Sequence, residues 1–108
     1  MRLRERARVL VVEDNPVNQL LVAEQLSRLG ASAVVVGTGL EALDALRGDH
    51  ELDCVLMDWQ LPGLDGVEVT RRHRSGEDPA ARVPIIGMTA SSRPTDREAC
   101  LDAGMDDL

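Results

Sequence analysis

Short runs of apolar, mostly β-branched residues alternate with helix-patterned segments along almost the whole chain. These runs are apolar at consecutive positions, which is typical of strands buried on both faces. A helix between two strands must pack back onto their sheet, so the order β-α-β-α-β-α-β-α predicts a three-layer α/β domain with a parallel sheet. The expected strands are residues 9–12, 33–36, 53–57 and 83–88, and the expected helices are residues 16–29, 39–48, 67–74 and 95–103.

Capping signals mark where the first two helices begin. Asn15 stands directly before Pro16, an N-cap residue followed by a first-turn proline. Thr38 and Glu41 have the spacing of a capping box. These signals predict helix starts near residues 16 and 39.

The length of 108 residues leaves room for one domain with one core. We expect this domain at residues 9–108, with residues 105–108 leading into a fifth strand. Residues 1–8 alternate Arg with other residues and carry no core pattern, so they are expected to form an arm or linker. Apolar residues make up 44% of the chain and Tyr and Phe are absent, which predicts an aliphatic core.

The charge balance excludes several classes of partner. The chain has 19 acidic and 12 basic residues, a net charge of −7. Such a chain lacks the basic face that nucleic-acid binding requires, and it disfavours contact with an anionic membrane. No apolar run approaches the roughly 20 residues needed to cross a bilayer, and the N-terminus lacks the apolar stretch of a signal peptide. We therefore expect a cytoplasmic domain.

Chemically competent side chains follow three of the expected strands. Glu13 and Asp14 follow the first strand, Asp58 the third and Thr89 the fourth. In open parallel sheets ligands bind outside the carboxyl ends of the strands, so these groups should converge. Two carboxylates about 4 Å apart repel by on the order of 4 kcal/mol, a cost that a bound Mg²⁺ would offset. The spacing predicts Glu13 and Asp14 as metal anchors, Asp58 as ligand and nucleophile, and Thr89 as a phosphate contact.

Four stretches of the chain carry recognisable motifs, at residues 9–18, 53–66, 83–90 and 103–107. Together they resemble the receiver domain of response regulators in two-component signalling, and the resemblance covers nearly the whole chain. Two of the motifs, Glu13-Asp-Asn-Pro-Val-Asn18 and Gly104-Met-Asp-Asp107, are most similar to receivers attached to hybrid sensor histidine kinases.

This resemblance implies a flavodoxin-like (CheY-like) fold with parallel strand order 2-1-3-4-5, its fifth strand and last helix truncated here. It implies Mg²⁺- or Mn²⁺-dependent phosphoryl transfer to Asp58 from a phosphohistidine of a histidine kinase or histidine phosphotransfer domain. Such a domain catalyses its own phosphorylation and dephosphorylation, and dimers occur. Glu13, Asp14, Asp58 and the backbone carbonyl of Gln60 would hold the metal. Thr89 would be the switch hydroxyl that repositions a protein-interaction surface.

Two departures from the family pattern leave alternatives open. The family's phosphate-contacting lysine lies on the fifth strand, and this chain contains no Lys. We expect this lysine to follow Leu108 in the native protein, and the alternative is a pseudo-receiver that serves only as an interaction module. The family also often has an aromatic switch residue near Leu108, where this chain has none. A further alternative is a metal-dependent phosphohydrolase that works through an aspartyl-phosphate. It is disfavoured, because it would need a cap domain and an acid-base carboxylate at position 60, where this chain has Gln.

Some side chains are expected to serve structure alone. Cys54 and Cys100 lack metal-ligand spacing and are expected to be buried, reduced thiols. His73 is expected at the surface. The apolar residues of the first helix are expected mainly in the core, with part of that helix available to dock a phosphotransfer helix. These apolar residues are Val17, Leu20 and Leu21.

Overall fold

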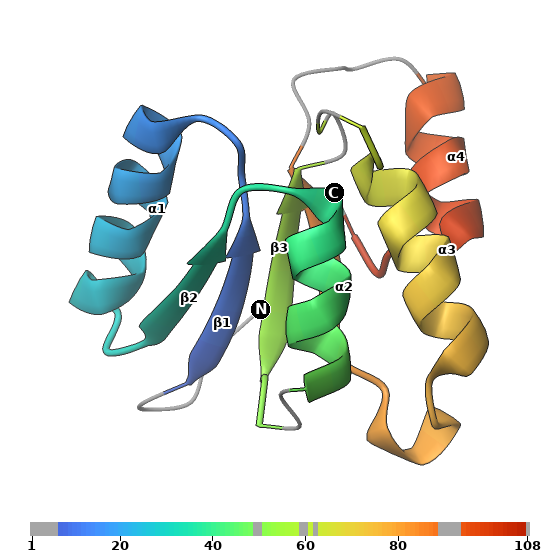
Figure 1. The fold of residues 1–108 in the computed structure, drawn as a ribbon, viewed down its shortest axis with the longest axis horizontal. Coiled ribbons are helices and arrows are strands. Elements are labelled where there is room, and N and C mark those ends of the chain that lie inside the picture. Colours follow the sequence, from blue (N-terminus) through green and yellow to red (C-terminus); the bar gives the residue numbers. More distant parts are fainter. Residues whose placement is uncertain (1–6, 49–50, 59–60, 62, 89–93, 108) are drawn as a thin grey trace.

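A parallel four-stranded sheet forms the middle layer of the domain (Figure 1). The computed structural model describes residues 7–48, 51–58, 61, 63–88 and 94–107. The strands pair in the order β2-β1-β3-β4, which confirms the predicted order for these four. The strands are β1 (Arg8–Val12), β2 (Ser32–Val36), β3 (Cys54–Asp58) and β4 (Ile85–Met88). The helices are α1 (Pro16–Arg28), α2 (Gly39–Gly48), α3 (Gly66–Gly76) and α4 (Pro94–Ala103), with a 3-10 turn η1 (Pro79–Ala81) before β4.

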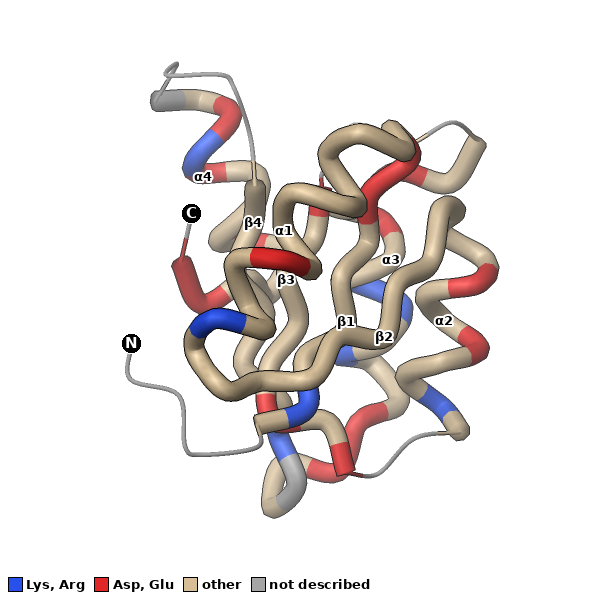
Figure 2. The backbone as a smooth tube through the Cα atoms, turned by 90° about the vertical axis from the view of Figure 1, so that its left-hand side faces the viewer, with Lys and Arg blue, Asp and Glu red and all other residues tan. Residues whose placement is uncertain are grey.

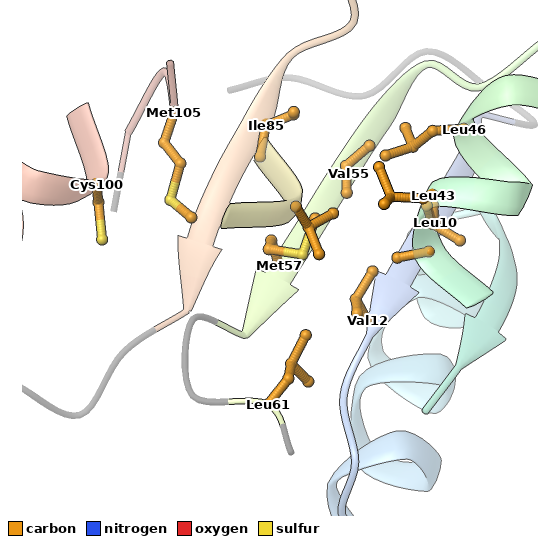
Figure 3. Packing of buried hydrophobic residues seen from close by; sticks show 12 residues of the cluster. Leu10, Val12, Leu43, Leu46, Val55, Met57, Leu61, Ile85, Cys100 and Met105 are labelled. Carbon is orange, nitrogen blue, oxygen red and sulfur yellow. The ribbon is translucent and has the colours of Figure 1, made fainter. Parts of the chain in front are cut away.

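The helices cover the two faces of the sheet unequally. Alternate strand residues such as Leu10, Met57 and Ile85 belong to a large core cluster with residues of α2 and α4 (Figure 3). Val9, Val11 and Cys54 belong to a smaller cluster with Leu26 of α1. Burial on both faces is the physical reason for the continuous apolar strand sequences.

The last described residues lie against the outer edge of β4. Asp107 forms a parallel bridge with Ile86. The Asp106 N–H donates to the carbonyl oxygen of Ile85 at 2.7 Å, and the Gly87 N–H donates to that of Asp107 at 2.8 Å. This pairing puts residues 106 and 107 at the edge where the fifth strand is expected, and the strand itself stays a prediction.

Both predicted helix caps are present. The Asn15 side chain accepts hydrogen bonds from the N–H groups of Val17 (2.9 Å) and Asn18 (3.2 Å). The Thr38 hydroxyl oxygen accepts from the Glu41 N–H at 3.2 Å and donates to the Glu41 carboxylate at 3.0 Å. These bonds satisfy N–H groups that have no partner within the helix.

The first strand begins earlier than expected. Ala7 is fully buried, and Arg8 pairs with Ser32 in the sheet. The Arg8 N–H also donates to the Asp53 carboxylate at 2.8 Å. Residues 7 and 8 therefore belong to the folded domain rather than to the arm expected at residues 1–8, whose first six residues lie outside the described part.

The prediction that the apolar residues of α1 lie mainly in the core is wrong. Val17, Leu20 and Leu21 are 63%, 74% and 52% exposed. The helix is rotated so that another set of residues, spaced three and four apart, faces the sheet. That inward stripe consists of Gln19, Val22, Ala23 and Leu26.

His73 is also placed differently from expectation. Its side chain is only 12% exposed, and its Nε2 atom lies 2.8 Å from the Glu77 carboxylate. By contrast, Cys54 and Cys100 are buried free thiols, as predicted, and burial raises the pKa of both thiols. None of the helices in the described ranges combines the length and apolarity needed to span a membrane.

Candidate metal centre

Three carboxylates meet at the carboxyl edge of the sheet. Val12 pairs with Met57 in the register of β1 and β3, so Glu13 and Asp14 begin beside the end of β3 at Asp58. One carboxylate oxygen from each of the three acids lies within 4.8 Å of the others. The predicted convergence of Glu13, Asp14 and Asp58 is therefore confirmed.

The three acids differ in exposure. Glu13 is 7% exposed, Asp14 is exposed and Asp58 is half-buried. Thr89 and Gln60, the expected phosphate contact and carbonyl ligand, lie outside the described residues.

Hydrogen bonds hold Glu13 from several sides. Its N–H donates to the Val36 carbonyl at 3.1 Å, and its Oε1 atom accepts from the Asn15 N–H at 3.0 Å. The side-chain amide of Gln19 donates to the Glu13 carbonyl oxygen at 2.6 Å. These contributions of Asn15 and Gln19 were not among the residues predicted for the site. The sequence carried no signal for Gln19, because the tertiary structure decided which residues of α1 face the sheet.

The charge distribution makes this edge suitable for a cation. Two of the clustered charges, at most 4.8 Å apart, repel by at least about 3.5 kcal/mol for an effective dielectric constant near 20. Figure 2 shows acidic segments (red) where β1 ends. Among the described residues, most Arg side chains belong to strand starts or to the later parts of helices, at the opposite edge. Carboxylate oxygens are ligands that Mg²⁺ and Mn²⁺ prefer, so the donor set fits a hard divalent cation.

A parallel sheet in the order β2-β1-β3-β4 with its acids at the carboxyl edge defines a flavodoxin-like α/β domain. The same fold occurs in the chemotaxis protein CheY4 of Vibrio cholerae, with a TM-score of 0.83 at 22% sequence identity. Residues 9–108 match the family described as the response regulator receiver domain. The chain belongs to this family, as the sequence resemblance predicted.

Its sequence relatives include much longer sensor kinases. The chain is 38% identical over 98 residues to the sensor histidine kinase RcsC of Escherichia coli, covering 91% of this chain and 10% of RcsC. It is 40% identical over 102 residues to the sensor protein GacS of Pseudomonas syringae pv. syringae, covering 93% of this chain and 11% of GacS. The chain thus spans about a tenth of the length of these relatives.

Solved receiver domains superpose on most of the chain. The receiver domain of sensor histidine kinase PA1611 from Pseudomonas aeruginosa PAO1 has a TM-score of 0.82 and 42% identity, covering 94% of this chain and 81% of that one. That structure has a magnesium ion coordinated in its active site cleft. The receiver domain of the Saccharomyces cerevisiae response regulator Ssk1 was crystallised with the histidine phosphotransfer signaling protein Ypd1. It has a TM-score of 0.85 and 30% identity, covering 95% of this chain and 77% of that one.

Proposed function

We propose that this receiver domain accepts a phosphoryl group on Asp58 in a reaction that depends on Mg²⁺. The observation that carries the proposal is the clustering of three carboxylate oxygens within 4.8 Å at the carboxyl edge of the sheet. Magnesium in the active site cleft of the 42% identical PA1611 receiver supports the choice of cation. Mn²⁺ is the alternative cation with the same ligand preference.

Each acid has its own role in this proposal. Glu13 and Asp14 would hold the cation together with Asp58 and the Gln60 carbonyl. When bound, the cation would neutralise charge on the phosphoryl oxygens. A carboxylate oxygen of Asp58 attacks the phosphorus atom, the P–N bond to the donor imidazole breaks, and an aspartyl-phosphate forms. The Thr89 hydroxyl would then hydrogen-bond a phosphoryl oxygen.

The donor is proposed to be a histidine kinase or a histidine phosphotransfer domain. The exposed apolar residues Val17, Leu20 and Leu21 start directly after the acid cluster, on the first turns of α1. Such a surface fits an apolar partner helix that carries the phosphohistidine. The Ypd1 complex of the similar Ssk1 receiver supports this class of partner. This role would place the domain in the cytoplasm. Two further expectations from the sequence, a dimer and no binding of nucleic acid, stay predictions.

Replacement of Asp58 by Asn should abolish labelling by acetyl phosphate in the presence of Mg²⁺. The amide is a poor nucleophile, so we expect at least a 100-fold loss of aspartyl-phosphate, measured by intact-protein mass spectrometry, in line with loss of a catalytic nucleophile. Asp44→Asn, at an exposed position of α2, is the control and should be labelled like the wild type. Equal labelling of the Asp58 variant would refute the assignment. A folded wild type that neither binds Mg²⁺ nor becomes labelled would favour the pseudo-receiver.

Replacement of Leu20 by Glu should slow phosphotransfer from a phosphorylated histidine phosphotransfer domain at least tenfold, as for loss of an apolar contact at the centre of an interface. Labelling by acetyl phosphate, which needs no docked partner, should be unchanged. Leu29→Glu is the matched control, because Leu29 is 67% exposed at the far end of α1. Equal effects of the two substitutions would place the docking surface elsewhere.

A further inference from the structure

We infer that Gln19 is a positioning residue for the metal centre, acting through the main chain of Glu13. The inference rests on the proposed function, since it assigns Gln19 a role in cation binding. Gln19 is the first member of the inward stripe of α1, which continues with Val22, Ala23 and Leu26. The other members of the stripe are apolar and face the sheet, so the amide of Gln19 needs a specific partner there.

That partner is the carbonyl oxygen of Glu13. The Gln19 Nε2 atom donates to it at 2.6 Å, while the N–H and Oε1 atoms of Glu13 are bonded to Val36 and Asn15. The three bonds come from β2, from the turn before α1 and from α1 itself. Together they set the direction in which the Glu13 carboxylate points at Asp58.

At Gly37 the turn between β2 and α2 passes close to this contact. A Cβ atom at Gly37 would lie 3.6 Å from the Gln19 Nε2 atom and 4.0 Å from the Glu13 carbonyl oxygen. The hydrogen bond therefore sits between α1 and the chain that leaves β2. Without the Gln19 amide, the Glu13 carbonyl would lose its side-chain hydrogen-bond donor at this partly buried position. The turn that carries Glu13 and Asp14 would then be less restrained.

Gln19 differs in exposure from the proposed docking residues of α1 that follow it. Leu20 and Leu21 are more than half exposed, whereas Gln19 is half-buried. A substitution at Gln19 can thus alter the metal centre without changing the apolar surface offered to a partner. This separation makes the inference testable by cation binding alone.

The test compares the Mg²⁺ affinity and the stability of the Gln19→Met and Val22→Ala variants with those of the wild type. Met keeps the length of the side chain but removes the amide donor, so the Mg²⁺ dissociation constant should rise about fivefold, as expected for one lost hydrogen bond. Binding is followed by the fluorescence of Trp59, the sole Trp and the residue after Asp58, and stability by urea unfolding. Val22→Ala removes core packing from the same stripe and should lower stability while leaving Mg²⁺ affinity within twofold.

Two results would overturn the inference while the proposed function stands. One is a Gln19→Met variant that binds Mg²⁺ as the wild type does. The other is a Val22→Ala variant that loses as much affinity, since binding would then follow stability alone. A wild type that shows no Mg²⁺ binding would instead overturn the proposed function and this inference with it.

Discussion

Replacement of Arg74 by Met is expected to lower the free energy of unfolding by about 3 kcal/mol, because it leaves acidic partners without their cation in a mostly buried network. For a domain of this size such a loss corresponds to a fall in Tm of roughly 12 °C. Urea unfolding at neutral pH and a thermal melt measure the two quantities. The site is remote from the carboxylate cluster, so the effect should fall on stability.

The Arg74 side chain is only 10% exposed and joins segments that are far apart in the sequence. Its Nη1 atom donates to the Glu77 carboxylate at 2.6 Å and to the Val83 carbonyl at 2.8 Å. Its Nε atom donates to the Gly104 carbonyl at 3.0 Å, and Nη2 to the Asp106 carboxylate at 2.8 Å. One guanidinium thus ties the end of α3 to the chain before β4 and after α4.

Two variants calibrate this prediction. Arg72→Met removes an exposed Arg that contacts Glu68 at 3.1 Å, and should cost less than about 1 kcal/mol. Arg74→Lys keeps the charge but lacks the planar fork of donors, so most of the loss should remain. If Arg74→Met and Arg72→Met had equal small effects, the buried network would contribute little to stability.

The acid dependence of stability offers a second readout. Burial acts to raise the pKa of Glu77, but hydrogen bonds from the Val83 N–H, Arg74 and His73 outweigh it, so that the pKa is lowered. For Asp106 burial is likewise outweighed, by the Ile85 N–H and by arginines that include Arg74, and its pKa is also lowered.

A lowered folded-state pKa sets the sign of the pH effect. The stabilisation from Glu77 and Asp106 is fully present at a pH above their pKa values in the unfolded chain, roughly 4. It is lost as the pH falls through their lower pKa values in the folded protein. The wild type should therefore lose stability on acidification below about pH 4, and the Arg74→Met variant should lose less over the same interval. Parallel pH profiles of the two proteins would argue against the network.

Replacement of Gly39 by Ala is the second large expected effect, a loss of about 2 kcal/mol from overpacking. A Cβ atom at this position would overlap the carbonyl oxygen of Leu64 and lie 2.9 Å from Val69 Cγ2. The Leu64 contact is backbone, so relief requires a shift of the connection between β3 and α3 that follows the acid cluster. Chemical denaturation measures the loss.

Helix propensity predicts the opposite sign, which sharpens the test. Ala is favoured over Gly by about 1 kcal/mol inside a helix. Gly48→Ala, at the other end of α2, is the matched control, because a Cβ there meets nothing within 4 Å. We expect no loss for Gly48→Ala. A stabilised Gly39→Ala variant would contradict the prediction, because it would show that the connection between β3 and α3 shifts without loss of stability.

Much of the candidate site follows from local sequence and the rules of parallel sheets. The apolar runs before Glu13 and Asp58 predict strands, and adjacent parallel strands carry the residues that follow them to one edge. The structure confirms this for Glu13, Asp14 and Asp58. The caps at Asn15 and Thr38 were equally predictable, since each bond joins residues two or three apart.

The sequence by itself thus determined the α/β class, the helix starts and the meeting of the three acids, because these depend on nearest neighbours and on strand order. Only the tertiary structure decided that α1 buries Gln19 while exposing Leu20. It also decided that Arg74 reaches Asp106 and that Gly39 touches Leu64. The rotation of a helix on a sheet and contacts between remote segments arise from packing of the whole chain, which no short stretch of sequence encodes.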